Sequence, residues 1–168
     1  LPIISAGPPQ TICPGTITFV NGSGAGIGGA YSWSNSLIDG NTFTPPAGAN
    51  TYTVTGTDAN NCSNTDQVIV TSQDIILPTV ITKHTNIYLD GSGNGNIAAA
   101  DLDFNSTDNC GIDTIIISRS TFSCIDVGPN VDTLIIKDIH GNINRDTTIV
   151  NVIDTISPIV ATQPDTIY

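Results

Sequence analysis

Apolar and polar residues alternate along most of the chain, which is the periodicity of half-buried β-strands. Before residue 74 the alternation is clearest in TITFV, YSWSN, NTFTP, NTYTVTGTD and QVIVT. After it, the same pattern predicts strands around TNIYLD, GIDTIIISR, VDTLIIKD and DTTIVNVID, with turns at DGSGNGN, STDNCG, VGPN and HGN. No stretch has a convincing helical period, although AAADLDF is compatible with a short helical turn.

An internal repeat divides the chain. DIILPTVITKHTNIY at 74–88 returns as DTISPIVATQPDTIY at 154–168, with seven of fifteen positions identical. The offset of 80 residues marks 74–153 as one complete module. We therefore expect a first module at 1–73, a second at 74–153 and the start of a further repeat at 154–168. Each module has the size and strand spacing of a small β-sandwich, with Trp33 as the core aromatic residue of the first.

The composition supports an all-β chain and excludes several functions. All 15 acidic residues are Asp and Met is absent, so strong helix formers are scarce. With a net charge of −11 and only four scattered basic residues, we expect no nucleic-acid partner and no binding to an anionic membrane. No apolar run approaches the roughly 18 residues that cross a bilayer. No export-signal pattern opens the sequence, so we expect any such signal to lie outside it.

The four cysteines have no CxxC spacing, and the two histidines are far apart, so a zinc site is not indicated. Disulfides explain the cysteines better. We predict one in each module, joining Cys13 to Cys62 and Cys110 to Cys124. This places the protein in an oxidising compartment.

Longer stretches resemble known families. ICPGTITF, YSWSN and TYTVTGTDANNCSNTDQVIVT resemble the Ig-like modules of large Bacteroidetes surface proteins. The stretch beginning LPTVITK, with AAD, STDNCGI and a D.HGN.N hairpin in order, resembles the HYR-like repeats of the giant gliding-motility adhesins of that phylum. Together the two resemblances cover nearly the whole chain. They imply tandem immunoglobulin-like β-sandwich modules, type IX export, and an outer-membrane-anchored surface filament with an adhesive or mechanical, non-enzymatic role.

Oxygen-bearing side chains cluster in two loops of the second module. They recur at short spacing in AAADLDFNSTDN, and a second group follows in KDIHGNIN. Hard oxygen ligands of this kind suit Ca²⁺, so we expect a structural calcium ion. The alternative is that Asp and Asn fill turns and cap a short helix. The candidate ligands are Asp101, Asp103, Asp108, Asn109 and Asp138, with Asn142 and Asn144 near the last of them.

Five Asp-Thr-(Ile/Leu/Thr) tripeptides resemble the O-glycosylation motif of exported Bacteroidetes proteins. A threonine that points into the core cannot be modified. The predicted acceptors are Thr114, Thr133, Thr147, Thr155 and Thr166.

Nothing in the sequence forms a recognisable catalytic group. His84 and His140 have no Ser or Cys in a known arrangement, and paired Asp residues on a small module would lack a deep cleft. Gly24, Gly26 and Gly29 satisfy GxGxxG, but a strand rather than a helix follows, so we reject a dinucleotide site and expect a flexible hairpin tip.

We therefore expect a non-catalytic stalk segment whose partners are neighbouring repeats of the same chain and surface or glycan ligands. One alternative is a carbohydrate-binding accessory module of a secreted glycoside hydrolase, which needs a row of exposed aromatic residues. Another is a self-assembling fibre subunit, which needs a long unpaired edge strand.

Overall fold

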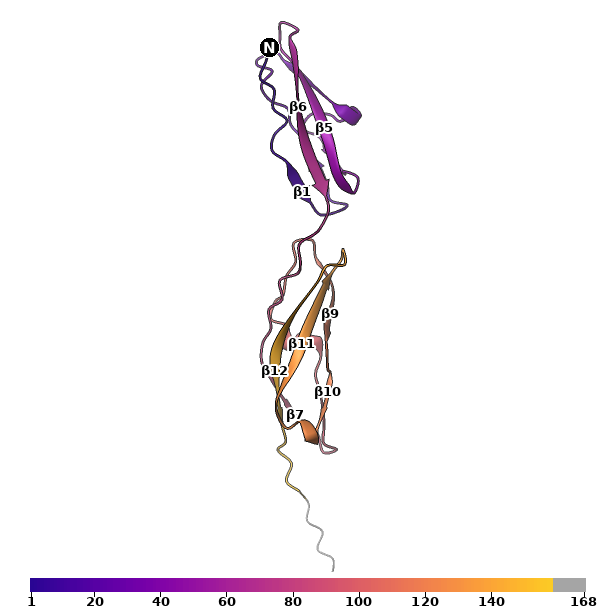
Figure 1. Ribbon diagram of the computed structural model, residues 1–168, viewed down its shortest axis with the longest axis vertical. Coiled ribbons are helices and arrows are strands. Elements are labelled where there is room, and N and C mark those ends of the chain that lie inside the picture. The colour runs from indigo at the N-terminus through magenta and orange to yellow at the C-terminus, as the bar shows by residue number, and fades with distance from the viewer. Residues whose placement is uncertain (159–168) are drawn as a thin grey trace, which may run out of the picture. The chain divides into compact units, whose positions relative to one another are not determined.

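The computed structural model describes residues 1–158 and divides into two compact units, Leu1–Ile75 and Ile76–Tyr168 (Figure 1). We call them module 1 and module 2. The division falls two residues after the boundary expected from the repeat. Of the predicted further repeat at 154–168, residues 159–168 lie outside the described part of the chain. No helix in residues 1–158 has the length and apolar character needed to cross a membrane.

Module 1 is a sandwich of a four-stranded and a two-stranded sheet. The larger sheet has the order β1-β6-β5-β3, and β2 pairs with β4. The long hairpin β5-β6 is antiparallel, whereas β1 runs parallel to β6. The bounds are β1 Gln10–Ile12, β2 Thr18–Phe19, β3 Ala30–Trp33, β4 Thr42–Phe43, β5 Gly48–Thr57 and β6 Ser63–Ser72, with a 3₁₀ turn at Ser34–Ser36.

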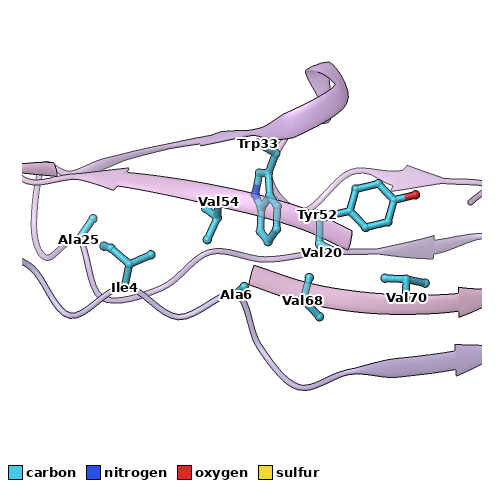
Figure 2. Close-up of a cluster of buried hydrophobic side chains, with 9 residues drawn as sticks. All are labelled: Ile4, Ala6, Val20, Ala25, Trp33, Tyr52, Val54, Val68 and Val70. Atoms are coloured by element: carbon cyan, nitrogen blue, oxygen red, sulfur yellow. The ribbon is translucent and has the colours of Figure 1, made fainter. Parts of the chain in front are cut away.

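The core of module 1 comes from the inward positions of these strands. Alternate residues of β5 and β6 are buried, as the period of two predicted. Trp33 packs among them at 7% exposure and donates its indole N–H to Asp39 Oδ1 at 2.7 Å, so its predicted core position is confirmed. Figure 2 shows the cluster: Ile4, Ala6, Val20, Ala25, Trp33, Tyr52, Val54, Val68 and Val70.

The glycine-rich loop of module 1 is anchored rather than a flexible tip. Ala25 is buried in the core, and its N–H donates to the Tyr31 hydroxyl at 3.0 Å. A Cβ at Gly24 would lie 1.8 Å from the carbonyl oxygen of Ile3, so only glycine fits there. The glycines of this loop therefore allow close packing of the backbone.

Module 2 has the same topology, although the sequence suggested two different kinds of unit. Its larger sheet has the order β7-β12-β11-β9, with β7 parallel to β12, and β10 pairs with β8. The bounds are β7 Thr85–Tyr88, β8 Asn94–Asn96, α1 Ala99–Leu102, β9 Ile112–Ile117, β10 Thr121–Ser123, β11 Gly128–Asp138 and β12 Ile143–Ile153, with a 3₁₀ turn, η2, at Cys124–Asp126. Both modules are therefore immunoglobulin-like β-sandwiches, as predicted.

The short strands of module 2 depend on pairing rather than on local sequence. Asn94–Asn96 lies in the predicted turn DGSGNGN, yet it forms β8 opposite β10. A Cβ at Gly95 would lie 3.1 Å from Ile87 Cδ1, so glycine allows β8 to approach the core. The predicted turn VGPN is also wrong, because β11 already begins at Gly128. The short helical turn in AAADLDF is confirmed as α1.

The core position Leu134 provides a test of the fold. Leu134 on β11 is fully buried, so Leu134→Ala should lower the free energy of unfolding of module 2 by about 3 kcal/mol through lost transfer energy and the cavity. Val131→Ala on the same strand removes a side chain that is 75% exposed and should change it by less than about 0.5 kcal/mol. Urea unfolding followed by circular dichroism measures both. Equal effects would show that β11 does not face the core as described.

Candidate functional site

The first segment of module 1 lies along the whole length of its last strand, β6. Asn64 Nδ2 donates to the Pro2 carbonyl oxygen at 3.0 Å, and the Ala6 N–H donates to Asp66 Oδ2 at 2.8 Å. Further along, β1 pairs with the end of β6 in parallel. These contacts follow one another in the same order on both segments.

Module 2 repeats this arrangement between residues 77–88 and β12 (Figure 1). Asn144 Nδ2 donates to the Pro78 carbonyl oxygen at 2.8 Å, and Thr82 Oγ1 donates to Asp146 Oδ2 at 3.4 Å. The Ile149 N–H then donates to His84 Nδ1 at 3.3 Å, before β7 pairs with the end of β12. We call this side-by-side parallel pairing of first segment and last strand the clasp.

The clasp was missed in the sequence, although it leaves a signal. An Asn-x-Asp triplet occurs at 64–66 and again at 144–146, and Leu-Pro occurs at 1–2 and 77–78. Asn144 was expected near a metal site, but its amide holds the clasp instead. The two triplets occupy equivalent places at the start of the last strand, and their repetition is the sequence signal that relates the two modules.

A serine corner is the second feature that the modules share. The Thr53 N–H donates to Ser34 Oγ at 3.0 Å, and the Thr133 N–H donates to Ser118 Oγ at 3.2 Å. In module 2 the buried Asp132 adds to this corner, because its Oδ1 accepts from the Thr133 N–H at 2.7 Å and from the Ser118 hydroxyl. The corner joins β9 to β11 and restricts the turn that follows β9.

The predicted disulfide pairs are wrong. Cys13 and Cys110 are disulfide-bonded, whereas Cys62 and Cys124 are free and exposed. In module 1, Cys13 follows β1 at the Ser72 end of β6, but Cys62 directly precedes Ser63 at the other end. Ten extended residues span roughly 30 Å, and a disulfide requires Cα atoms within about 7 Å.

The same separation excludes the second predicted pair. Cys110 lies just before β9, whose Ile112 pairs with Asp138 at the end of β11. Cys124 lies in η2, just before Gly128 at the start of β11. The two cysteines are therefore at opposite ends of one long strand.

Alkylation of the native, unreduced protein should distinguish the two sets of cysteines. Iodoacetamide should modify Cys62 and Cys124 and leave Cys13 and Cys110 unmodified, because only the first two are free thiols. Peptide mass spectrometry reads out the four sites, and reduction before alkylation should expose all of them. Protection of Cys62 or Cys124 in the unreduced protein would contradict this assignment.

Two of the predicted metal ligands stabilise local turns instead. Asp101 Oδ2 accepts from the Ala98 N–H at 2.7 Å at the start of α1, and Asp103 Oδ1 accepts from the Ser106 N–H at 3.2 Å. Neither lies in a cluster of three metal-ligating side chains in the described part of the chain. Asn109 is exposed and donates to Cys110 Sγ at 2.9 Å. Asp101 and Asp103 therefore make the capping and turn contacts that the alternative describes.

Asp108 and Asp138, in contrast, are brought together. Each contributes a carboxylate oxygen, and these oxygens lie within 4.8 Å of one another. Asp138 is fully buried; burial raises its pKa, but donors from the Asn142 side chain and the N–H groups of Asn142 and His140 outweigh burial and lower the pKa overall. Asp138 is therefore ionised at neutral pH.

Several Asp residues share the turn geometry of Asp138. Asp138 Oδ1 accepts from the N–H groups of His140 and Asn142, two and four residues ahead. Asp58 and Asp90 form the same contacts in their own turns. Many Asp residues of the chain thus stabilise turns by accepting backbone N–H groups. The turn geometry alone does not define an ion site.

Three predicted glycosylation acceptors share the outer face of the larger sheet of module 2. Thr133 on β11 pairs with Thr147 on β12, and Thr114 on β9 pairs with Lys137. Thr114 and Thr147 are exposed, Thr133 is half-buried, and Thr155 is exposed after β12. Thr166 lies outside the described residues. Modification of these side chains stays a prediction.

An ion pair closes the turn after β10. Arg119 Nη2 lies 2.5 Å from Asp126 Oδ2, and its guanidinium lies 4.4 Å from the centre of the Phe122 ring. The hydrogen bond from Arg119, together with that from the Ser123 N–H, lowers the pKa of Asp126. The charged carboxylate is therefore stabilised in the folded protein.

Asp126 predicts an acid-dependent loss of stability. Because its folded-state pKa is lowered, its contribution is complete above the unfolded-state value of about 3.9 and disappears as the pH falls through the folded value. Asp126→Asn should therefore lower the melting temperature at pH 7, and the difference from the wild type should shrink at pH 3 and below. Asp113→Asn, at an exposed ion pair with Lys137, is the control and should have little effect. A difference that grows with acidity would contradict the assignment.

An open groove of about 630 Å³ lies at one end of module 2. Asp90, Cys124 and Asp154 are its titratable lining residues, with Gly93, Ile156 and Pro158. Asp90 accepts backbone N–H groups, which lower its pKa, and Asp154 accepts the Ile156 N–H at 2.9 Å. Asp154 thus starts a turn directly after β12. The groove offers no paired acid and base.

No family model and no curated protein matches the chain. Among solved structures, human mucin-like protocadherin EC1-2 is similar at 13% identity with a TM-score of 0.35, over 91% of this chain and 99% of that one. The fibronectin(III)-like modules of Clostridium thermocellum CbhA are similar at 10% identity and a TM-score of 0.33, over 96% and 100%. The human desmocollin-1 ectodomain is similar at 14% identity and a TM-score of 0.30, over 96% of this chain and 38% of that one. At this level the similarities carry no argument about function.

Proposed function

We propose that the chain is a non-catalytic, load-bearing segment of a large exported adhesin at the cell surface. The observation that carries this proposal is the clasp, which occurs in both modules with the same order of contacts. A device built twice around the first and last segments of a module suits a protein that is pulled by its ends.

The direction of force relative to the strands decides how a module resists extension. Because first segment and last strand are parallel, tension between the two ends of a module slides these segments past one another. All the contacts of the clasp are then loaded in shear and at the same time. In an antiparallel hairpin pulled from its adjacent ends, the bonds would instead open one after another. The clasp therefore resists extension better than the hairpins that make up the rest of each sheet.

The exported location rests on cysteine chemistry. Cys13 and Cys110 are disulfide-bonded, and disulfides persist in oxidising compartments outside the cytosol. The resemblance to Bacteroidetes surface repeats extends the proposal to a surface filament exported by the type IX system and used in attachment or gliding. Its partners would be neighbouring repeats and surface glycans.

The carbohydrate-binding alternative lacks a platform in the described residues. Trp33, Tyr52 and Phe122 are buried in the cores. The strongly exposed aromatic residues are Phe19 in module 1 and Tyr88 and Phe104 in module 2, so neither module presents three in a row. The buried aromatic residues therefore serve folding, and the exposed ones are too few in either module to form a sugar platform.

The fibre alternative requires a long open edge, which the larger sheets do not provide. Their edge strands are β1 and β3 in module 1 and β7 and β9 in module 2. The longest of these, β9, has six residues, whereas the interior strands have ten or eleven. Short edges of this kind limit pairing between chains.

Single-molecule pulling of the chain from its two ends, after reduction of Cys13 and Cys110, tests the proposal. We expect two discrete unfolding events, one for each module, because each clasp fails as a unit. Asn144→Ala removes one clasp hydrogen bond, worth about 1 kcal/mol, and should lower the unfolding force of one event only. Thr147→Ala is the matched control: Thr147 lies on the same strand, its exposed side chain makes none of the clasp contacts described above, and the change should leave both forces unchanged. Gradual extension without force peaks would overturn the load-bearing role.

A further inference from the structure

Two loops of module 2 lie against one another where β9 begins and β11 ends. One is the turn at 108–111, in which Asp108 Oδ1 accepts the N–H groups of Cys110 and Gly111 at 2.8 and 2.9 Å. The other is the Asp138 turn between β11 and β12. The Ile139 N–H donates to the Gly111 carbonyl oxygen at 3.1 Å and joins the two. The positions of both carboxylates are therefore fixed by backbone.

One oxygen of the Asp108 and Asp138 carboxylates has no hydrogen-bond partner. Asp108 Oδ2 has less than 1 Å² of accessible surface and no hydrogen-bond donor. It belongs to a carboxylate that lies within 4.8 Å of a carboxylate oxygen of the fully buried Asp138. The ion pairs of Arg119 with Asp126 and of Lys137 with Asp113 involve neither of these two carboxylates. Two adjacent carboxylates repel, and a buried anionic oxygen without a partner is costly.

We propose that Asp108 and Asp138 bind a divalent cation, Ca²⁺, between them. The ion would accept the unpartnered Asp108 Oδ2 and an Asp138 oxygen as ligands and remove the repulsion between the two carboxylates. Ca²⁺ fits because it takes hard oxygen ligands in flexible geometry and completes its shell with water. With two carboxylates fixed here, we expect binding in the weak range of extracellular modules, about 10⁻⁴ to 10⁻³ M.

Module 1 supplies an internal comparison. Asp58 occupies the corresponding hairpin turn and accepts the N–H groups of Asn60 and Cys62 at 2.8 and 2.9 Å. It belongs to no cluster of metal-ligating side chains in the described part of the chain. The turn is thus present without the second carboxylate, and we infer a cation only where the two carboxylates meet.

Calorimetric titration with CaCl₂ and thermal unfolding in CaCl₂ or excess chelator test the site. The wild type should bind and should melt at higher temperature with calcium. Asp108→Asn keeps the backbone contacts of Oδ1 but removes the charge, so its affinity should fall about tenfold or more. In chelator, the same variant should melt at or above the wild-type temperature, because the repulsion is gone. Asp58→Asn and Asp101→Asn are the matched controls and should bind like the wild type.

Three results would overturn the site: no heat and no calcium-dependent shift in the wild type, full binding by Asp108→Asn, or loss of binding in Asp101→Asn. If Asp108→Asn does not fold, the wild-type titration decides alone. MgCl₂ in place of CaCl₂ shows whether the site selects the larger ion. The proposed calcium ligands are not part of the clasp. Failed calcium binding would therefore leave the two force peaks expected, and absent force peaks would leave the titration unaffected.

Discussion

The parallel pairing of the first segment with the last strand is the constraint on which each module depends. It fixes the strand order of the larger sheet, because the chain must return to the strand beside which it began. The hairpins β5-β6 and β11-β12 then supply the interior strands, and their inward residues form the core. The short strands β8 and β10 pair only because this framework places them over that core.

Asp side chains form many of the remaining stabilising contacts, and the role of each one follows from its neighbours. Asp66 and Asp146 hold the clasp, Asp101 caps α1, and Asp126 meets the guanidinium of Arg119. Asp58 and Asp90 close turns by accepting backbone N–H groups, which leaves most of the negative charge in loops. The Asp side chain is short, and its ionised carboxylate only accepts hydrogen bonds. It therefore suits turns, caps and loops, where backbone N–H groups need an acceptor.

The sequence predicted what depends on local pattern. The alternation in NTYTVTGTD and DTTIVNVID identified interior strands, because a sheet with one buried face imposes a period of two. It failed where the partner decides the outcome: Asn94–Asn96 has turn composition and becomes β8 opposite Thr121–Ser123. The cysteine pairs failed for a related reason, since chain order does not tell at which end of a ten-residue strand a thiol lies. Of the candidate ligands, Asp101 and Asp103 are satisfied within their own turns, and only a contact between loops singles out Asp108 and Asp138.

The clasp also determines when a module can form during synthesis of the chain. Its first segment finds its partner only in the last strand, so roughly sixty residues must be available before the larger sheet can close. A chain made from its N-terminus therefore has no native partner for that segment until β6, or β12, has followed. The larger sheet of each module closes only after nearly the whole module has been made. The pairing that joins the two ends of a module thus sets the shortest length of chain that can fold.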